Sequence, residues 1–485
     1  MRPVPSPLNP PPVLPADLDE IVLSALARHR APGCAVAVAY GGRHWTGAYG
    51  LARTEPAMPF LPETRIPVAS MTKPFTATAV LALVERGLVD LDAPVVAYLP
   101  GFRVADPAAT AAVTVRHLLT HLSGWLGDEP ELVGGRGEGA LAEQVAAFAT
   151  LPQILPPGTA FSYSNTGLDV AGRLVEVVSG RGYEAFAEEE ILAPLGMTDS
   201  TFFAERVISA PAAAGHLRGD DGSVRPVQEA WLLPRGVNPS GGLISTAGDQ
   251  LRWLRWWLGD LDADGPLSPG TRRLMITDPV PVRAGAGTGL GWHLDDLPRG
   301  PAQVSAVYHE GSLEGTATVC RFVPEAGLAV VVLTNVDDGQ LVHREISDRL
   351  LAELAGIGRP ERRVDRTPRQ EELAAYAGIY TTPDARAEVA AGSSTTPDAR
   401  VEVAAGSSTT PDTRVEVTAA SGELRLRVHL ERPLEMSAGR VEGDDFTLID
   451  GIWQEEPVTF LRTPDGDLLG LRIAGRVFPR RGGAA

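Results

Sequence analysis

The chain has 485 residues, 44% of them hydrophobic, so it can bury a large core and is longer than one ordinary domain. Its 61 acidic and 43 basic residues give a net charge of −18, which repels phosphate backbones and argues against nucleic-acid binding. No run of about 18 apolar residues occurs, so we expect no membrane span. The first 15 residues are rich in proline and lack the apolar stretch of a secretion signal. We therefore predict a cytoplasmic protein.

After this proline-rich lead, apolar residues recur on one face over residues 16–30, which predicts a helix. Two strand-like runs follow, GCAVAVAY and RHWTGAYG, and the Gly41-Gly42 pair between them indicates a hairpin. A helix is expected from near Ser70 to about Glu85. Helical patterns then dominate to about residue 205, and one more helix is expected over 247–260.

Residues 304–335 are typical of consecutive antiparallel strands, with turns near Gly311–Gly315 and Pro324–Gly327, and residues 344–356 of a helix. Strands thus lie near both ends of residues 16–356, and helices fill the middle. We predict an α+β fold there: an antiparallel sheet flanked by helices, with a helical insertion.

The charged, proline-containing segment 357–371 is predicted to be a linker, and the short strands of 372–485 a small all-β domain. This tail contains a 14-residue repeat over residues 381–422: TTPDARAEVAAGSS, TTPDARVEVAAGSS and TTPDTRVEVTAASG. Each copy has the pattern of a turn, a strand and a second turn. Two interpretations stay open: the copies form a meander, or a duplicated segment forms a partly ordered excursion.

Cys34 and Cys320 are the only cysteines, and each lies in an apolar, strand-like run. Two buried thiols are the preferred interpretation, because no secretion signal is seen. A disulfide is the alternative.

Lys73 is the only lysine; the other 42 basic residues are arginines. Ser70 precedes it by three residues, so on a helix the two side chains share one face. A serine hydroxyl needs a base to become a good nucleophile, and an arginine does not give up its proton in a protein. A lysine can act as that base where burial and nearby positive charge favour the neutral amine. The pair therefore indicates an activated serine.

Two further segments carry groups that suit the same chemistry. In FSYSNTG, Tyr163 could share a proton with a lysine, and Asn165 could hold an ester or amide of the substrate. In YHEGSLEG, the sequence His309-Glu310-Gly311-Ser312 lies on a strand whose glycine allows close approach to the backbone. A backbone N–H there, with that of Ser70, could form an oxyanion hole. Each segment alone is more typical of an ordinary turn.

Together and in this order, S-x-x-K, Y-x-N and H-x-G resemble the serine β-lactamase and penicillin-binding-protein superfamily. The resemblance covers about residues 18–355. It is greatest to class C β-lactamases, family VIII esterases and D-aminopeptidases, and stretches such as TVRHLLTHLSGW and NPSGGLISTAGDQLRWL support it. The tail resembles the β-barrel appended to some of these hydrolases.

The resemblance implies a role for each matching residue. Ser70 would be the acylated nucleophile, Lys73 and Tyr163 together the general base, and Tyr163 the acid. Asn165 would orient the substrate. The N–H groups of Ser70 and Ser312 would form the oxyanion hole, and His309 and Gly311 would occupy the third motif.

One position departs from the family pattern. In β-lactamases and D,D-peptidases the third motif begins with a lysine that binds the substrate's carboxylate, whereas this chain has His309, which is largely neutral at pH 7. Esters or small amides are therefore the expected substrates. The leading hypothesis is a serine hydrolase that forms an acyl-enzyme. The alternatives are a transacylase that passes the acyl group to an amine or alcohol in natural-product biosynthesis, and a sensor that acylates without turnover.

Two further patterns are not expected to carry function. His117 and His121 have the spacing of zinc ligands on a helix, but H-E-x-x-H is absent, so no metal or other cofactor is expected. Trp253, Trp256 and Trp257 are expected to pack inside the protein rather than against a membrane. The expected partner is a small-molecule ester or amide.

Overall fold

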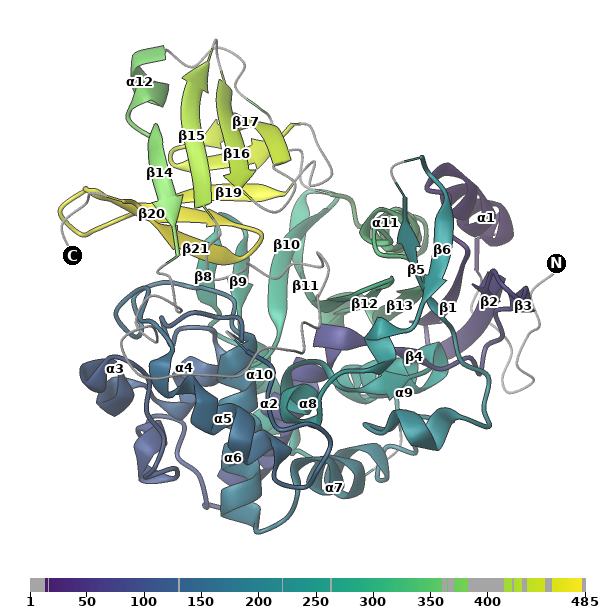
Figure 1. Cartoon of the computed structure of the whole chain (residues 1–485). Coiled ribbons are helices and arrows are strands. Elements are labelled where there is room, and N and C mark those ends of the chain that lie inside the picture. The colour runs from purple at the N-terminus through teal and green to yellow at the C-terminus, as the bar shows by residue number, and fades with distance from the viewer. Residues whose placement is uncertain are drawn as a thin grey trace.

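The computed structural model contains two sheet-based parts, which lie side by side in Figure 1. Most of the proline-rich lead, the linker and the repeat lie outside the residues it describes. Those residues are 14–15, 17–129, 131–219, 221–261, 264–359, 364, 370–382, 414–420, 423–429, 434–449 and 456–481.

The first part is built on a nine-stranded antiparallel sheet in the order β3-β2-β1-β13-β12-β11-β10-β9-β8. Its strands are β1 (Gly33–Tyr40), β2 (Arg43–Arg53), β3 (Met58–Pro59), β8 (Val280–Arg283), β9 (Ala286–Thr288), β10 (His293–Arg299), β11 (Ala302–Leu313), β12 (Thr316–Val323) and β13 (Leu328–Thr334). The pairing of β1 with β13 joins the two ends of this part, as the sequence predicts. The expected hairpin of β1 and β2 is also confirmed.

Helices cover both faces of this sheet. Alternate residues of β1 point to opposite faces of the sheet and belong to two separate apolar cores. Ala35 and Ala37 lie in the core on the face covered by α9 (Ala247–Leu258). Val36 and Val38 lie in the core on the opposite face, which α1 and α11 cover. The helix α1 (Leu18–Arg28) packs against α11 (Gln340–Ala355). The α+β prediction is therefore confirmed.

The helical insertion lies beyond the α9 face (Figure 1). Its centre is α2 packed on α6, and the short strands β4 and β7 pair beside them. The α-helices and strands of the whole first part that have not yet been given bounds are α2 (Lys73–Glu85), α3 (Pro107–Ala112), α4 (Val115–Leu119), α5 (Ala140–Ala147), α6 (Asn165–Ser179), α7 (Tyr183–Ala187), α8 (Asn238–Gly241), α10 (Pro269–Ile276), β4 (Ile66–Pro67), β5 (Gly215–Arg218), β6 (Val224–Val227) and β7 (Ile244–Ser245).

The C-terminal part is an eight-stranded antiparallel sheet in chain order, preceded by the short helix α12 (Gln370–Ala374). A bridge between Tyr380 and Arg480 brings its first and last strands together, so the sheet is a nearly closed barrel around an apolar core. The strands are β14 (Gly378–Thr381), β15 (Arg414–Ala420), β16 (Glu423–His429), β17 (Leu434–Glu442), β18 (Asp445–Leu448), β19 (Pro457–Arg462), β20 (Leu468–Ile473) and β21 (Arg476–Pro479). The barrel-like prediction is confirmed; of the repeat, only β15 and the first two residues are described.

The structure also refines local expectations. Ser70 lies on a 3₁₀ turn, η1 (Ala69–Thr72), and the α-helix begins at Lys73 rather than at Ser70. The strand β11 continues to Leu313, so Gly311 lies in the strand and not in the turn. Cys34 and Cys320 are free and buried, which confirms the thiol interpretation. Within the described ranges, no helix has the length and apolarity to cross a membrane.

Candidate active site

The buried amine of Lys73 lies beside the Ser70 hydroxyl. Lys73 is 0% exposed, and its Nζ lies 3.0 Å from Ser70 Oγ and 2.7 Å from the carbonyl oxygen of Ser240. Ser70 itself is partly exposed. The 3₁₀ turn thus presents the hydroxyl toward the surface, while the first turn of α2 holds the amine beneath it.

The turn that carries Ser70 is strained and firmly held. Ala69 has a φ of +52°, a left-handed conformation that costs an L-residue about 1–2 kcal/mol. Thr72 Oγ1 donates to the Ala69 carbonyl at 2.6 Å, and Thr318 Oγ1 donates to the Val68 carbonyl at 3.0 Å. These hydrogen bonds, one within the turn and one from β12, fix the direction of the nucleophile.

The strand β11 passes close to this turn along an open edge. Its pairing with β10 ends at Tyr308 opposite His293, so residues 309–313 pair only with β12. A side chain at Gly311 would place its Cβ 2.2 Å from the Val68 carbonyl oxygen, so only glycine allows this approach. Ser312 is partly exposed, and its hydroxyl accepts a hydrogen bond from Gln340 at 3.3 Å.

Tyr163 directly precedes the N-cap of α6, and cations lie on its ring. The Ser164 side chain caps the helix by accepting from the Gly167 N–H. Lys73 Nζ lies 4.9 Å from the centroid of the Tyr163 ring, and the Arg476 guanidinium carbon lies 4.5 Å from it. The His121 ring stacks on it at 4.6 Å. The tyrosine ring therefore lies beside both Lys73 and the Arg476 guanidinium.

Asn165 begins α6 and belongs to a polar chain that reaches the barrel. Its Nδ2 donates to Asp128 Oδ1 at 3.2 Å, and Asp128 accepts two hydrogen bonds from Arg476, at 2.5 and 2.9 Å. Asp128 and Arg476 side chains are each only 6% exposed. This buried ion pair joins the barrel to the residues around Tyr163.

The hairpin turn between β20 and β21 makes the contact with the site. Ala474 and Gly475 have φ values of +48° and +76°, as a tight two-residue hairpin requires. The Gly475 carbonyl accepts from the Tyr163 N–H at 2.9 Å, and the Val477 N–H donates to Ser162 Oγ at 3.3 Å. The barrel therefore covers one side of the candidate site, a contact that sequence reasoning did not locate.

His309 is buried, and this burial lowers its pKa well below the usual range. Positive charge on the neighbouring His293 or Lys73 would lower it further. His309 Nδ1 lies 2.7 Å from the Glu310 carbonyl oxygen, so Nδ1–H is the donor and Nε2 carries the lone pair. His293, whose ring lies 4.8 Å away, has its pKa lowered to about 4 by burial.

The structure thus brings Ser70, Lys73, Tyr163 and His309 together and places the free edge of β11 beside them. The two histidines weighed as metal ligands accept backbone N–H groups instead: His117 from Thr114 and His121 from Ser164.

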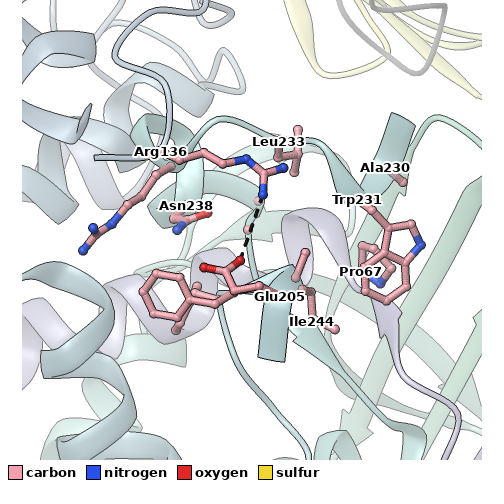
Figure 2. A pocket seen from close by; sticks show the side chains of 14 residues that line it. Pro67, Arg136, Glu205, Ala230, Trp231, Leu233, Asn238 and Ile244 are labelled. Carbon is pink, nitrogen blue, oxygen red and sulfur yellow. Dashed lines mark ion pairs between the residues drawn. The ribbon is translucent and has the colours of Figure 1, made fainter. Parts of the chain in front are cut away.

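A small hollow of about 50 Å³ lies beside the nucleophile turn (Figure 2). Ser70 does not line it, but Pro67 does, as do Gly241 and Gly242, which follow the lysine's acceptor Ser240. Phe202, Phe203, Trp231, Leu233 and Ile244 supply an apolar lining, and an ion pair between Arg136 and Glu205 crosses it at 4.0 Å.

Comparison with known proteins gives consistent matches. Residues 18–355 match the family model described as Beta-lactamase. Penicillin-binding protein 4 of Amycolatopsis lactamdurans is 34% identical over 367 residues, 73% of this chain and 93% of that protein. Esterase EstB of Burkholderia gladioli is 34% identical over 365 residues, 66% of this chain and 90% of that protein. The crystal structure of SurE superposes with a TM-score of 0.72 at 25% identity and covers 96% of this chain and 99% of that one.

Proposed function

Because the chain belongs to the β-lactamase family, we propose that it is a serine hydrolase that acts on an ester or amide through an acyl-enzyme at Ser70. The observation that carries the proposal is the 3.0 Å contact between Ser70 Oγ and the buried Lys73 amine. The amine is within reach of the hydroxyl proton, and the Tyr163 ring centroid lies 4.9 Å from the amine.

In the proposed reaction, Ser70 Oγ bonds to the substrate's carbonyl carbon while its proton passes to the neutral Lys73 amine. We assign the oxyanion to the N–H groups of Ser70 and Ser312, because Ser312 lies on the stretch of β11 that pairs only with β12. Lys73 and Tyr163 then return the proton to the leaving group, whose bond to carbon breaks. Water attacks the ester by the reverse route and releases the acid.

The neutral His309 bears on the substrate. A neutral imidazole with a free lone pair offers no charge to a carboxylate, so we propose that the substrate is recognised without one. The named relatives include a penicillin-binding protein and an esterase, which supports both ester and amide bonds as targets. We assign the hollow of Figure 2, whose lining mixes apolar side chains with the Arg136–Glu205 ion pair, to the acyl side of the substrate.

The test is intact-mass measurement after mixing with a short-chain p-nitrophenyl ester, with and without added amines and alcohols. A transient adduct that water clears, absent from Ser70→Ala, is the expected result. An adduct that persists until an amine or alcohol is added would show a transacylase instead. If neither the ester nor a reactive fluorophosphonate labels Ser70, the proposal is wrong.

A further inference from the structure

An ion pair crosses the hollow that we assign to the acyl side of the substrate (Figure 2). Arg136 Nη1 lies 4.0 Å from Glu205 Oε2, and the two side chains are 57% and 62% exposed. Other parts of the lining are buried, and Asn238 is only 4% exposed. Gly241 of the lining lies against the nucleophile turn, since a Cβ on it would be 3.9 Å from the Ala69 carbonyl carbon. The ion pair therefore lies at the outer end of the hollow, and the nucleophile turn lies behind its inner end.

Two separate segments bring these charges together. The glycine-rich sequence GGRGEG presents Arg136, and Gly135 before it has a φ of +58°, which favours glycine. The Gly135 carbonyl accepts from the Arg235 N–H at 2.9 Å, and Arg235 also lines the hollow. Glu205 comes from the 3₁₀ turn η5 (Ala204–Val207). The fold of both segments, rather than their neighbourhood in sequence, thus places the two charges across the hollow.

Every charged side chain in the described lining has a partner of opposite charge. Besides Arg136 and Glu205, the lining contains Arg235, whose Nε and Nη2 each donate to the Glu184 carboxylate at 2.9 Å. Asn238 Nδ2 donates to the same carboxylate at 2.8 Å. The hollow therefore offers no unpaired charge to a substrate, and a charged acyl group would lose its water there without gaining a partner.

The hollow is also small. One water molecule needs about 10–15 Å³ of such space, so about 50 Å³ accommodates about three or four non-hydrogen atoms. An acyl chain of that length reaches from the nucleophile turn toward the ion pair, so the end of the chain meets Arg136 and Glu205.

We propose that the Arg136–Glu205 ion pair determines specificity: it keeps the outer end of the hollow neutral, so that the enzyme takes short, uncharged acyl groups. Alone, Arg136 attracts an acyl group that ends in a carboxylate, and Glu205 attracts one that ends in an ammonium; together, each charge cancels the other. This inference rests on the proposed function, which supplies the acyl-enzyme at Ser70.

Three ethyl esters with acyl chains of similar length test the ion pair. Ethyl pentanoate, monoethyl succinate and ethyl 4-aminobutyrate have acyl groups that end in a methyl, a carboxylate and an ammonium at neutral pH. Rates of ethanol release should show that the parent prefers the pentanoate. Glu205→Gln should raise kcat/KM for the succinate ester relative to the pentanoate by about fivefold, and Arg136→Gln should do the same for the aminobutyrate ester. The exchange Arg136→Glu with Glu205→Arg should restore the parent's preference.

Arg349→Gln and Glu189→Gln are the matched controls, because they remove the same charges from surface ion pairs that do not line the hollow. All four side chains are more than half exposed, so the variants should fold. If both test variants keep the parent's ratios while the pentanoate is still cleaved, the proposed specificity is wrong and the proposed function stands. Equal shifts in the controls would show an effect of net charge and overturn the specificity as well. If no ester is cleaved and no adduct forms at Ser70, the proposed function fails, and this inference with it.

Discussion

Two tight turns meet at the candidate site, and they are held in different ways. The nucleophile turn around Ala69 and Ser70 is held by a hydrogen bond within the turn, from Thr72 to Ala69, and by one from Thr318 of β12 to Val68. The barrel turn at Ala474 and Gly475 comes from a separate sheet. Its Gly475 carbonyl accepts a hydrogen bond from the Tyr163 N–H, and the buried ion pair between Arg476 and Asp128 lies next to this contact. The first turn carries the proposed nucleophile, and the second contacts Tyr163 from the barrel. If the proposed function holds, changes at the two turns should affect chemistry and access separately.

The largest expected effect tests the nucleophile turn. Lys73→Arg keeps the positive charge, but an arginine does not give up its proton and cannot act as the base. We therefore expect kcat/KM to fall by about three orders of magnitude or more. Steady-state kinetics with a p-nitrophenyl ester measures the loss. Arg206→Lys, at a side chain 55% exposed, is the matched control and should change little. Activity within about tenfold of the parent would exclude Lys73 as the base.

The next effect tests the barrel turn. Arg476→Gln leaves Asp128 buried without its cation, so the free energy of unfolding should fall by about 3 kcal/mol. The double variant Asp128→Asn with Arg476→Gln should recover much of this loss, because no charge remains unpaired. Urea unfolding of the three variants measures both values.

The same variants test the proposed cover over Tyr163. If the turn limits access, Arg476→Gln should raise kcat/KM for a bulky ester relative to a short one by about tenfold. An unchanged ratio would show that the barrel turn stabilises the site without selecting substrates.

The contrast between the turns also explains what the sequence could predict. The spacing of Ser70 and Lys73 is a local signal, and the order of the three motifs located Tyr163 and His309, so the groups on the first sheet and its helices could be named in advance. No local signal distinguishes Arg476 among 42 arginines, since its partner Asp128 lies 348 residues away and packing alone brings them together.

A smaller effect is expected at the third motif. His309→Lys replaces a neutral imidazole with a cation, so the KM of an ester with a carboxylate on its acyl group should fall by about tenfold relative to its neutral isostere. Paired kinetics with the two esters measures the ratio. An unchanged ratio for every anionic substrate tried would show that position 309 does not face the substrate.

The smallest effect compares the turns directly, because each has an alanine with a positive φ: Ala69 at +52° and Ala474 at +48°. Glycine relieves about 1–2 kcal/mol of left-handed strain but costs about 0.5–1 kcal/mol of backbone entropy. Ala69→Gly and Ala474→Gly should therefore each raise the free energy of unfolding by about 0.5 kcal/mol, measured by urea unfolding.

Only Ala69→Gly should also lower kcat, since it loosens the residue beside the nucleophile, whereas Ala474 lies in the cover. If both variants lower kcat equally, the two turns act as one unit and the separation of chemistry from access does not hold. If neither does, the strain at Ala69 results from the close approach of β11 at Gly311 and does not position Ser70.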